Sequence, residues 1–404
     1  MRLNIASQVG RVRAWPVHSA SMAAECLRAK PKVRMIATMN GLAPVRASSG
    51  TGGRLAWVFA IVLAVGALFS YVAGWLTPHR LTPARVVDTF ERINGPHPGF
   101  RRNHAKGVTI SGNFAANGAG SRLSKASVFR AGSVPVPVVG RFALAGGMPY
   151  AGDSAATVRS LALAFSLPNG EEWRTGMNNI PVFIVNTPEA FSEQLIALAP
   201  EPATQKPNPA RAQAFMAKHP ETMRAIRAIK AQAPTAGFED STYNSLNAFH
   251  LIDAAGRVTA VRWSMVPLQG APAVPPPTAA PTGANFLFDA LIAHVEDAPL
   301  RFRLVLTIAQ PGDATNDATL AWPEDREKLE VGTLTIDRVE GEATGSARII
   351  NFDPLILPNG IAGSDDPLLS ARSAAYSQSF TRRVAEPVAS SAVKTTAAGE
   401  VSQP

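Results

Sequence analysis

Three short segments of this chain carry side chains that could act together on a peroxide. His104 lies in the first, Asn178 in the second, and Arg372 and Tyr376 in the third. A neutral imidazole can take a proton from one peroxide oxygen and deliver it to the other near neutral pH, and an amide can hydrogen-bond the same ligand without adding charge. Tyrosine is one of the few side chains that serve as an axial ligand of haem iron. The set therefore predicts a haem-dependent site that cleaves a peroxide.

The spacing of Arg372 and Tyr376 supports the ligand role, because residues at i and i+4 share one face of a helix. A free tyrosine loses its proton near pH ~10, and a nearby cation favours the anion. Each segment alone has an ordinary explanation. The histidine segment reads as a loop with a solvated Lys106, the asparagine segment as a turn before a strand at 182–185, and the third as a helix surface. Their occurrence together and in this order favours the site.

Further segments match the same pattern. Residues 134–142 read Val-Pro-Val-Pro-Val-Val-Gly-Arg-Phe, and residues 351–361 contain Asn-Phe-Asp-Pro and Leu-Pro-Asn-Gly-Ile. Together with the three segments above, they resemble the haem catalase superfamily, and the short chain resembles its catalase-related peroxidase branch. The resemblance runs from about Val86 to Arg383. It implies an α+β fold, in which a catalase-like antiparallel β-barrel has helices around it and follows one transmembrane helix.

The resemblance also implies roles for single residues. His104 and Asn178 would be the catalytic pair above the iron, and Tyr376 the axial iron ligand. The single cysteine, Cys26, leaves no Cys-x-x-Cys-His for covalent attachment, so the expected cofactor is non-covalent haem b. The residues expected to contact it are Arg101, Arg141 and Arg372, at the propionates or the proximal ligand, and Phe183 and Phe191, beside the macrocycle.

Four positions depart from the family pattern. The usual serine that hydrogen-bonds the catalytic histidine is Ala143 here, so the histidine is expected to lack that partner. Two valines that narrow the access channel are Asn103 and Ala145, and an acidic channel residue is Thr157. These changes should weaken selection for hydrogen peroxide, admit larger hydroperoxides and make dismutation poor.

The charge distribution excludes one class of partner. The net charge is +9, but residues 1–54 hold nine Lys and Arg against one acid, Glu25, and the remainder is nearly balanced. No basic patch alternates with aromatics in the part expected to fold, so a nucleic-acid partner is rejected.

Residues 55–76 contain no charged side chain, and about 20 apolar residues suffice to cross a bilayer. Trp57, Tyr71 and Trp75 lie near the ends, as interfacial aromatics do, and the basic flank places the N-terminus in the cytoplasm. This predicts a single-pass inner-membrane protein with its catalytic domain on the periplasmic side. A buried core helix and a cleaved signal peptide are the alternatives, although the run exceeds the usual apolar region of about 7–15 residues in a signal peptide.

Four regions follow along the chain. A basic lead at 1–54 is expected to be disordered, and Met39 would make a sensible later start. The anchor at 55–76 precedes a haem-binding domain at 77–384 and a disordered tail at 385–404. Apolar periodicity predicts strands at 108–114, 134–144, 162–167, 182–185, 249–253, 258–265, 301–309 and 331–338, helices at 87–93, 209–232 and 286–296, and a Pro-rich connector at 269–281.

The favoured function is a haem peroxidase that reduces organic hydroperoxides, and hydrogen peroxide weakly, with an external electron donor of unknown identity. Such an enzyme would protect against reactive oxygen species. A haem-binding or haem-sensing protein without turnover is the alternative from another class, and a true catalase is the alternative among enzymes. A sensor has no need of His104 and Asn178, so their presence favours an enzyme.

Overall fold

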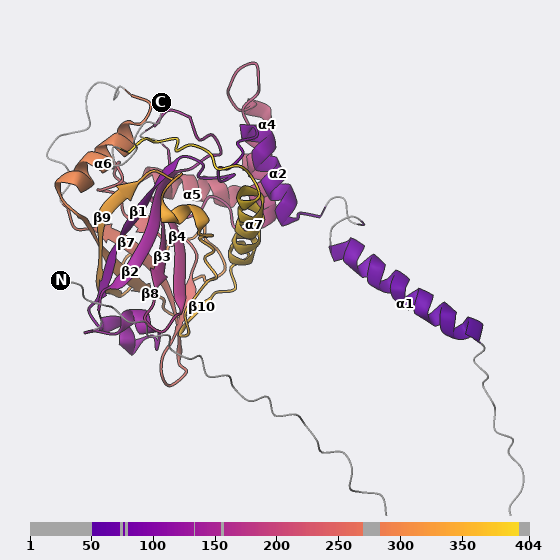
Figure 1. Cartoon of the computed structure of the whole chain (residues 1–404), viewed down its shortest axis with the longest axis horizontal. Coiled ribbons are helices and arrows are strands. Elements are labelled where there is room, and N and C mark those ends of the chain that lie inside the picture. The colour runs from indigo at the N-terminus through magenta and orange to yellow at the C-terminus, as the bar shows by residue number, and fades with distance from the viewer. Residues whose placement is uncertain are drawn as a thin grey trace, which may run out of the picture. The chain divides into compact units, whose positions relative to one another are not determined.

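The computed structural model describes residues 51–72, 76, 80–132, 134–154, 157–269 and 283–395 (Figure 1). Residues 1–50 of the basic lead, most of the Pro-rich connector and the last nine residues of the predicted tail lie outside these ranges. Contacts divide the chain into two units, 1–64 and 65–404. Helix α1 (Thr51–Val72) runs across this boundary, and its apolar residues are not buried by the rest of the described chain. Its length and composition suit a membrane span, and they also suit a signal sequence.

Eight antiparallel strands close into a barrel, in the order β7-β5-β4-β3-β2-β1-β9-β8, with β8 pairing back to β7. Two short strands, β6 (Phe249–Ile252) and β10 (Ile361–Gly363), extend the sheet from β7. Alternate side chains of each strand point to opposite faces, and in β8 every second residue from Leu300 to Leu306 is fully buried. The barrel strands are β1 (Gly107–Ala116), β2 (Val136–Leu144), β3 (Arg159–Ser166), β4 (Glu172–Asn178), β5 (Tyr243–Asn244), β7 (Val258–Pro267), β8 (Leu300–Ile308) and β9 (Lys328–Glu340).

Aromatic side chains fill the inside of the barrel. The rings of Phe165 and Trp173 stack with centroids 4.7 Å apart, and those of Phe249 and Trp263 with centroids 4.1 Å apart. The Trp263 indole donates a hydrogen bond to Thr175 Oγ1 at 3.0 Å, so its buried polar atom has a partner. These aromatic side chains belong to the buried hydrophobic core of the domain.

Several helices begin with the same kind of capping residue. In four of the described helices a Thr, Asn or Asp side chain accepts a hydrogen bond from the first turn, and proline follows it. The helices are α2 (Pro83–Asn94), α3 (Pro188–Ala197), α4 (Pro209–Lys218), α5 (Pro220–Lys230), α6 (Phe286–Asp297) and α7 (Pro367–Val384), with short 3-10 turns η1 (Ala119–Arg122), η2 (Ser127–Phe129) and η3 (Ser346–Ile349).

Three sequence expectations about secondary structure and the end of the domain differ from the structure. The single helix predicted at 209–232 is two helices, because Pro220 cannot donate to the preceding turn and starts α5 instead. The strand predicted at 182–185 is irregular, and Phe183 N donates to Ala318 O outside any ladder. The folded domain continues past 384 to at least 395, where Val393 is buried and Ser391 Oγ accepts from Ala343 N.

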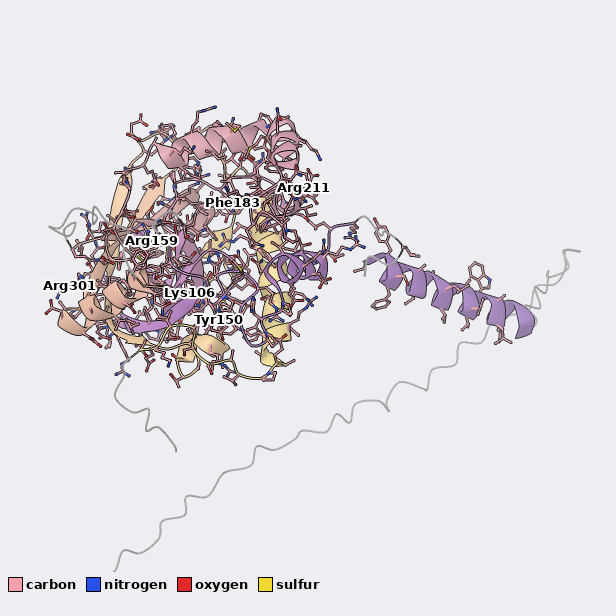
Figure 2. The ribbon with its side chains drawn as sticks, turned by 90° about the horizontal axis from the view of Figure 1, so that it is seen from above. Lys106, Tyr150, Arg159, Phe183, Arg211 and Arg301 are labelled. Atoms are coloured by element: carbon pink, nitrogen blue, oxygen red, sulfur yellow. The ribbon has the colours of Figure 1, made fainter. Side chains whose placement is uncertain are left out.

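Lys106 is not the solvated lysine of the ordinary explanation. Figure 2 labels Lys106 within the folded domain. Its ammonium is buried just before β1, where it donates to Asp153 at 2.6 Å and to the carbonyl oxygens of Ala151 and Ala284. An ammonium group has three protons to donate, so all the donors of this buried group have acceptors. It fixes the point at which the His104 loop enters the barrel.

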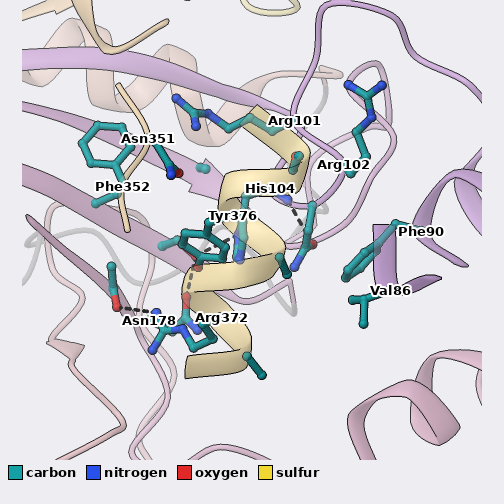
Figure 3. Close-up of a pocket in the computed structure, with 18 of the residues that line it drawn as sticks. Val86, Phe90, Arg101, Arg102, His104, Asn178, Asn351, Phe352, Arg372 and Tyr376 are labelled. Carbon is teal, nitrogen blue, oxygen red and sulfur yellow. Dashed lines mark hydrogen bonds between the residues drawn. The ribbon is translucent and has the colours of Figure 1, made fainter. Parts of the chain in front are cut away.

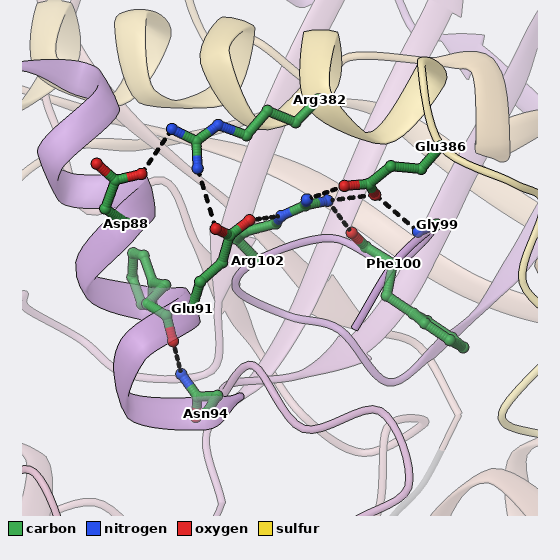
Figure 4. Close-up of polar contacts among 9 residues, drawn as sticks. Asp88, Glu91, Asn94, Gly99, Phe100, Arg102, Arg382 and Glu386 are labelled. Carbon is green, nitrogen blue, oxygen red and sulfur yellow. Dashed lines mark hydrogen bonds and ion pairs between the residues drawn. The ribbon is translucent and has the colours of Figure 1, made fainter. Parts of the chain in front are cut away.

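An ion-pair network ties α2 to the end of α7 (Figure 4). The Arg102 guanidinium, buried beside the His104 loop, donates to Glu91 on α2 and to Glu386 just beyond α7. Arg382 on α7 pairs in turn with Asp88 and Glu91 on α2. The network therefore holds together the two helices and the loop that enclose the site described next.

Candidate active site

A pocket with an empty volume of about 1430 Å³, counting its open mouth, lies between the outer face of β2–β4 and helices α2, α3 and α7 (Figure 3). Segments far apart in the sequence meet there. All eight residues that the sequence analysis selected line its wall: Arg101, His104, Arg141, Asn178, Phe183, Phe191, Arg372 and Tyr376.

Small residues lie on the central strands of the pocket wall, next to an arginine on β2. Strand register places Arg141 on β2, Ala162 on β3 and Gly176 on β4 directly opposite one another. A Cβ at Gly176 would lie 3.4 Å from Arg372 Nη2 and 3.9 Å from the Tyr376 hydroxyl. A larger side chain at this glycine would therefore fill the space beside the tyrosine oxygen.

His104 projects from a strained loop before β1. Its φ of 54° lies in the left-handed region, which few non-glycine residues adopt. The Asn103 side chain holds this conformation, since its Oδ1 accepts from His104 N at 2.9 Å and from Gly146 N at 3.0 Å. Strain of this kind is found at functional positions that the surrounding structure fixes. Asn103 therefore shapes the His104 loop as well as the pocket wall.

The pKa of His104 is lowered from its ordinary value to about 3. Burial is the main cause, and the positive charges of Arg141, Arg372 and Arg101 act in the same direction. The imidazole is therefore neutral across the physiological range, so one of its ring nitrogens carries a lone pair and can accept a proton.

The expectation that His104 lacks a hydroxyl partner is wrong. Ser160 on β3 places its Oγ 2.9 Å from His104 Nδ1 and donates to Asn178 Oδ1 at 2.5 Å. Ser160 lies directly opposite Ala143, the position where the family pattern has its serine. No sequence signal marked Ser160, because the contact depends on which strands are neighbours and on their register.

Helix α7 carries Arg372 and Tyr376 on one face, as their spacing predicts. The Arg372 guanidinium carbon lies 5.8 Å from the centre of the Tyr376 ring. Its Nη1 donates to Asn247 Oδ1 at 2.5 Å, and its Nη2 donates to Gly176 O at 3.1 Å. These bonds dock α7 on β4 and keep the guanidinium charge beside the tyrosine.

A buried cluster of Arg101, Arg141, Arg383 and Glu342 lies at one end of the pocket. Glu342 takes two hydrogen bonds from Arg141 and lies 3.9 Å from Arg101. Burial lowers the pKa of Arg101 well below its ordinary value and that of Arg383 to about 10. The sequence analysis missed Arg383, although it stands two helical turns after Tyr376 on the same face of α7, and it missed Glu342.

The charge of this cluster fits the two propionates of haem. Three guanidinium groups against one carboxylate leave a formal excess of two positive charges. Arg101 Nε and Arg383 Nη2 are buried without a hydrogen-bond partner among the described residues, although buried donors normally have one. Two carboxylates at this end of the pocket would supply the missing charge and acceptors.

Apolar side chains line the pocket on the side of helices α2 and α3. The Phe191 ring lies 6.0 Å from that of Phe90 and 5.7 Å from that of Phe183. Of the three positions expected to shape access, Asn103 lines the pocket, whereas the described wall does not include Ala145 or Thr157. The wall suits a large, flat, mainly apolar ligand with a polar end.

A family model described as Catalase matches residues 74–397. The chain belongs to the catalase family. A catalase-related peroxidase of Synechococcus elongatus is 37% identical over 303 residues, which cover 75% of this chain and 89% of the relative. A catalase-related peroxidase of Mycolicibacterium paratuberculosis is 33% identical over 75% of this chain and 95% of its own length. The resemblance stated from the sequence is confirmed.

Solved catalases share the fold of this catalase-family chain. A bacterial catalase superposes with a TM-score of 0.63 at 20% identity, covering 76% of this chain and 61% of the catalase. A fungal catalase superposes with the same TM-score at 17% identity, covering 74% of this chain and 62% of the catalase. The predicted catalase-like barrel with surrounding helices is therefore confirmed.

Proposed function

We propose that this catalase-family protein is a haem peroxidase that reduces organic hydroperoxides with an external electron donor and protects against reactive oxygen species. One observation carries the proposal: the His104–Ser160–Asn178 chain and the Arg372–Tyr376 pair line a single pocket (Figure 3). The cofactor is non-covalent haem b, since the single cysteine cannot form a Cys-x-x-Cys-His attachment. A haem sensor would leave the His104–Ser160–Asn178 chain without a role.

Haem, when bound, supplies the iron at which the O–O bond breaks. Tyr376 would be its protein ligand through the phenolate oxygen, and the guanidinium carbon of Arg372 lies 5.8 Å from the centre of its ring. His104 is neutral and takes the proton from one peroxide oxygen, then returns it to the departing oxygen. Asn178 orients the peroxide by hydrogen bonding. The departing group therefore leaves as water or an alcohol instead of an anion.

The pocket wall favours an organic substrate. Val86 and Phe90 on α2 present apolar surface to the pocket, in addition to Phe183 and Phe191, which are expected beside the haem. An alkyl group gains free energy from contact with such a surface, at roughly 25 cal/mol per Å² buried. Hydrogen peroxide has no alkyl group and therefore gains no such free energy from the apolar wall.

The decisive experiment compares two peroxides on the purified haem-loaded protein. With a dye donor, kcat/KM for an alkyl hydroperoxide should exceed that for hydrogen peroxide by at least about tenfold, a modest contribution for an apolar pocket. An oxygen electrode should record little oxygen from hydrogen peroxide alone. Vigorous oxygen release without a donor would favour the second candidate, a true catalase. That candidate gains support from Ser160, which gives His104 the partner that Ala143 cannot.

We further propose that residues 55–76 anchor the protein in the inner membrane, with the catalytic domain in the periplasm. The proposal rests on the length and composition of α1 and on the nine basic residues before Leu55. Alkaline phosphatase fused after Pro78 should be active in a bacterial host, and the matched fusion after Gly50 should be inactive. An inactive Pro78 fusion would contradict the orientation, and a mature N-terminus beyond Leu76 would contradict the anchor.

A further inference from the structure

Ser160 occupies the centre of a row that crosses three strands. It lies opposite Ala143 on β2 and opposite Asn178 on β4. Side chains directly opposite each other on antiparallel strands have Cβ atoms about 4.5–5.5 Å apart. A hydroxyl at Ser160 can therefore reach Asn178, whose Oδ1 lies 2.5 Å away. The loop before β1 brings His104 Nδ1 to 2.9 Å from the same hydroxyl.

The strand that carries Ser160 is held firmly in register beside this row. Arg159 N donates to Asn179 Oδ1 at 2.8 Å, and Asn179 N donates to Arg159 O at 2.9 Å. The side chain of Ser160 is itself nearly buried, and its residue is 8% exposed. Water therefore has little access with which to replace its hydrogen bonds.

The single proton of the Ser160 hydroxyl fixes which groups donate and which accept in the His104–Ser160–Asn178 chain. A serine hydroxyl has one proton and can also accept. Because the Ser160 proton goes to Asn178 Oδ1, the oxygen accepts from His104 Nδ1–H. The neutral imidazole then carries its lone pair on Nε2, and the Asn178 amide has both protons of Nδ2 available for a ligand.

We infer that Ser160 is a positioning residue that sets the tautomer of His104 and the orientation of the Asn178 amide together. It does from β3 what a serine at position 143 would do from β2. The inference rests on the proposed function, in which His104 accepts a proton and Asn178 donates a hydrogen bond. Compared with the family pattern, the hydroxyl is on β3 at position 160 instead of on β2 at position 143, and it still forms a hydrogen bond with the histidine.

The position of the hydroxyl can be exchanged experimentally. Haem-loaded Ser160→Ala should keep wild-type haem content but bind cyanide about 10- to 100-fold more weakly, because hydrogen cyanide must give its proton to the histidine before the anion binds. Peroxide cleavage should slow by a similar factor, the usual loss when a supporting hydrogen-bond partner of a metal site is removed. The double variant Ser160→Ala/Ala143→Ser should recover most of both losses. Ser166→Ala, exposed at the end of the same strand, is the matched control.

Three results would overturn the inference. Unchanged or improved cyanide affinity in Ser160→Ala would show that the hydroxyl does not set the tautomer. A double variant as impaired as Ser160→Ala would show that the hydroxyl is not exchangeable between strands. Loss of haem from Ser160→Ala would assign the residue to cofactor binding. A wild type without peroxidase turnover would contradict the proposed function alone, since cyanide binding reports on His104 independently.

Discussion

Tyr376→Phe should leave a folded protein that binds haem at least ~10²-fold more weakly, or with a different ferric spectrum. Removing a residue that only supports a metal ligand typically costs 10- to 100-fold in affinity, so removing the ligand itself should cost no less. Tyr376 lines the pocket beside Arg372, and the glycine opposite leaves room at its hydroxyl. The measurement is haem titration of the apoprotein, followed by absorption spectroscopy.

The control for this substitution is Tyr150→Phe, because Tyr150 is 65% exposed and lies outside the pocket wall. It should bind haem like the wild type. If Tyr376→Phe retained the unmodified ferric spectrum and wild-type affinity, another group would have to be the protein ligand, and the proposed role of α7 would fail.

His104→Ala should cut peroxidase turnover by at least ~10²-fold while haem stays bound, because general acid–base catalysis contributes at least that much. The variant removes the group that moves the proton, whereas Tyr376 and the arginine cluster remain. His294→Ala on α6, outside the pocket wall, is the matched control. An unimpaired His104→Ala would contradict the mechanism.

The pH dependence of the wild type tests the same role. The pKa of His104 is lowered to about 3, so the imidazole remains deprotonated as the pH falls through 6.5, the ordinary value. Turnover should therefore be flat between about pH 5 and 8, and the loss on acidification should begin only as the pH approaches 3. A turnover loss centred near pH 6.5 would show that the imidazole titrates normally in the working enzyme.

Ser160 changes the interpretation of the departures from the family pattern. If only position 143 is considered, His104 has lost the serine hydroxyl with which it would form a hydrogen bond. In the folded protein the hydroxyl is present, supplied by the strand next to β2. The remaining argument for poor dismutation rests on Asn103 in the pocket wall and on the apolar surface of Val86 and Phe90 on α2, not on a poorly held histidine.

The sequence by itself determined the side chains available for chemistry and much of the local structure. Arg372 and Tyr376 share a helix face because four residues complete about one turn, and the structure places the guanidinium over the ring. The strands around β1, β2, β7, β8 and β9 followed from apolar alternation, which needs only neighbouring residues. The order of the short segments along the chain, together with the resemblance to the catalase family, identified the eight selected residues.

Tertiary structure decided what depends on neighbours far apart in sequence. Ser160 meets a histidine 56 positions earlier, and Glu342 meets an arginine 201 positions earlier. Such contacts depend on strand order and register, and a one-residue slip would turn each side chain to the other face. The segment at 182–185 has the composition of a strand, yet Phe183 bonds to Ala318 in a loop. Local periodicity gives each residue its conformational preference, whereas the packed barrel decides which hydrogen-bond partner it meets.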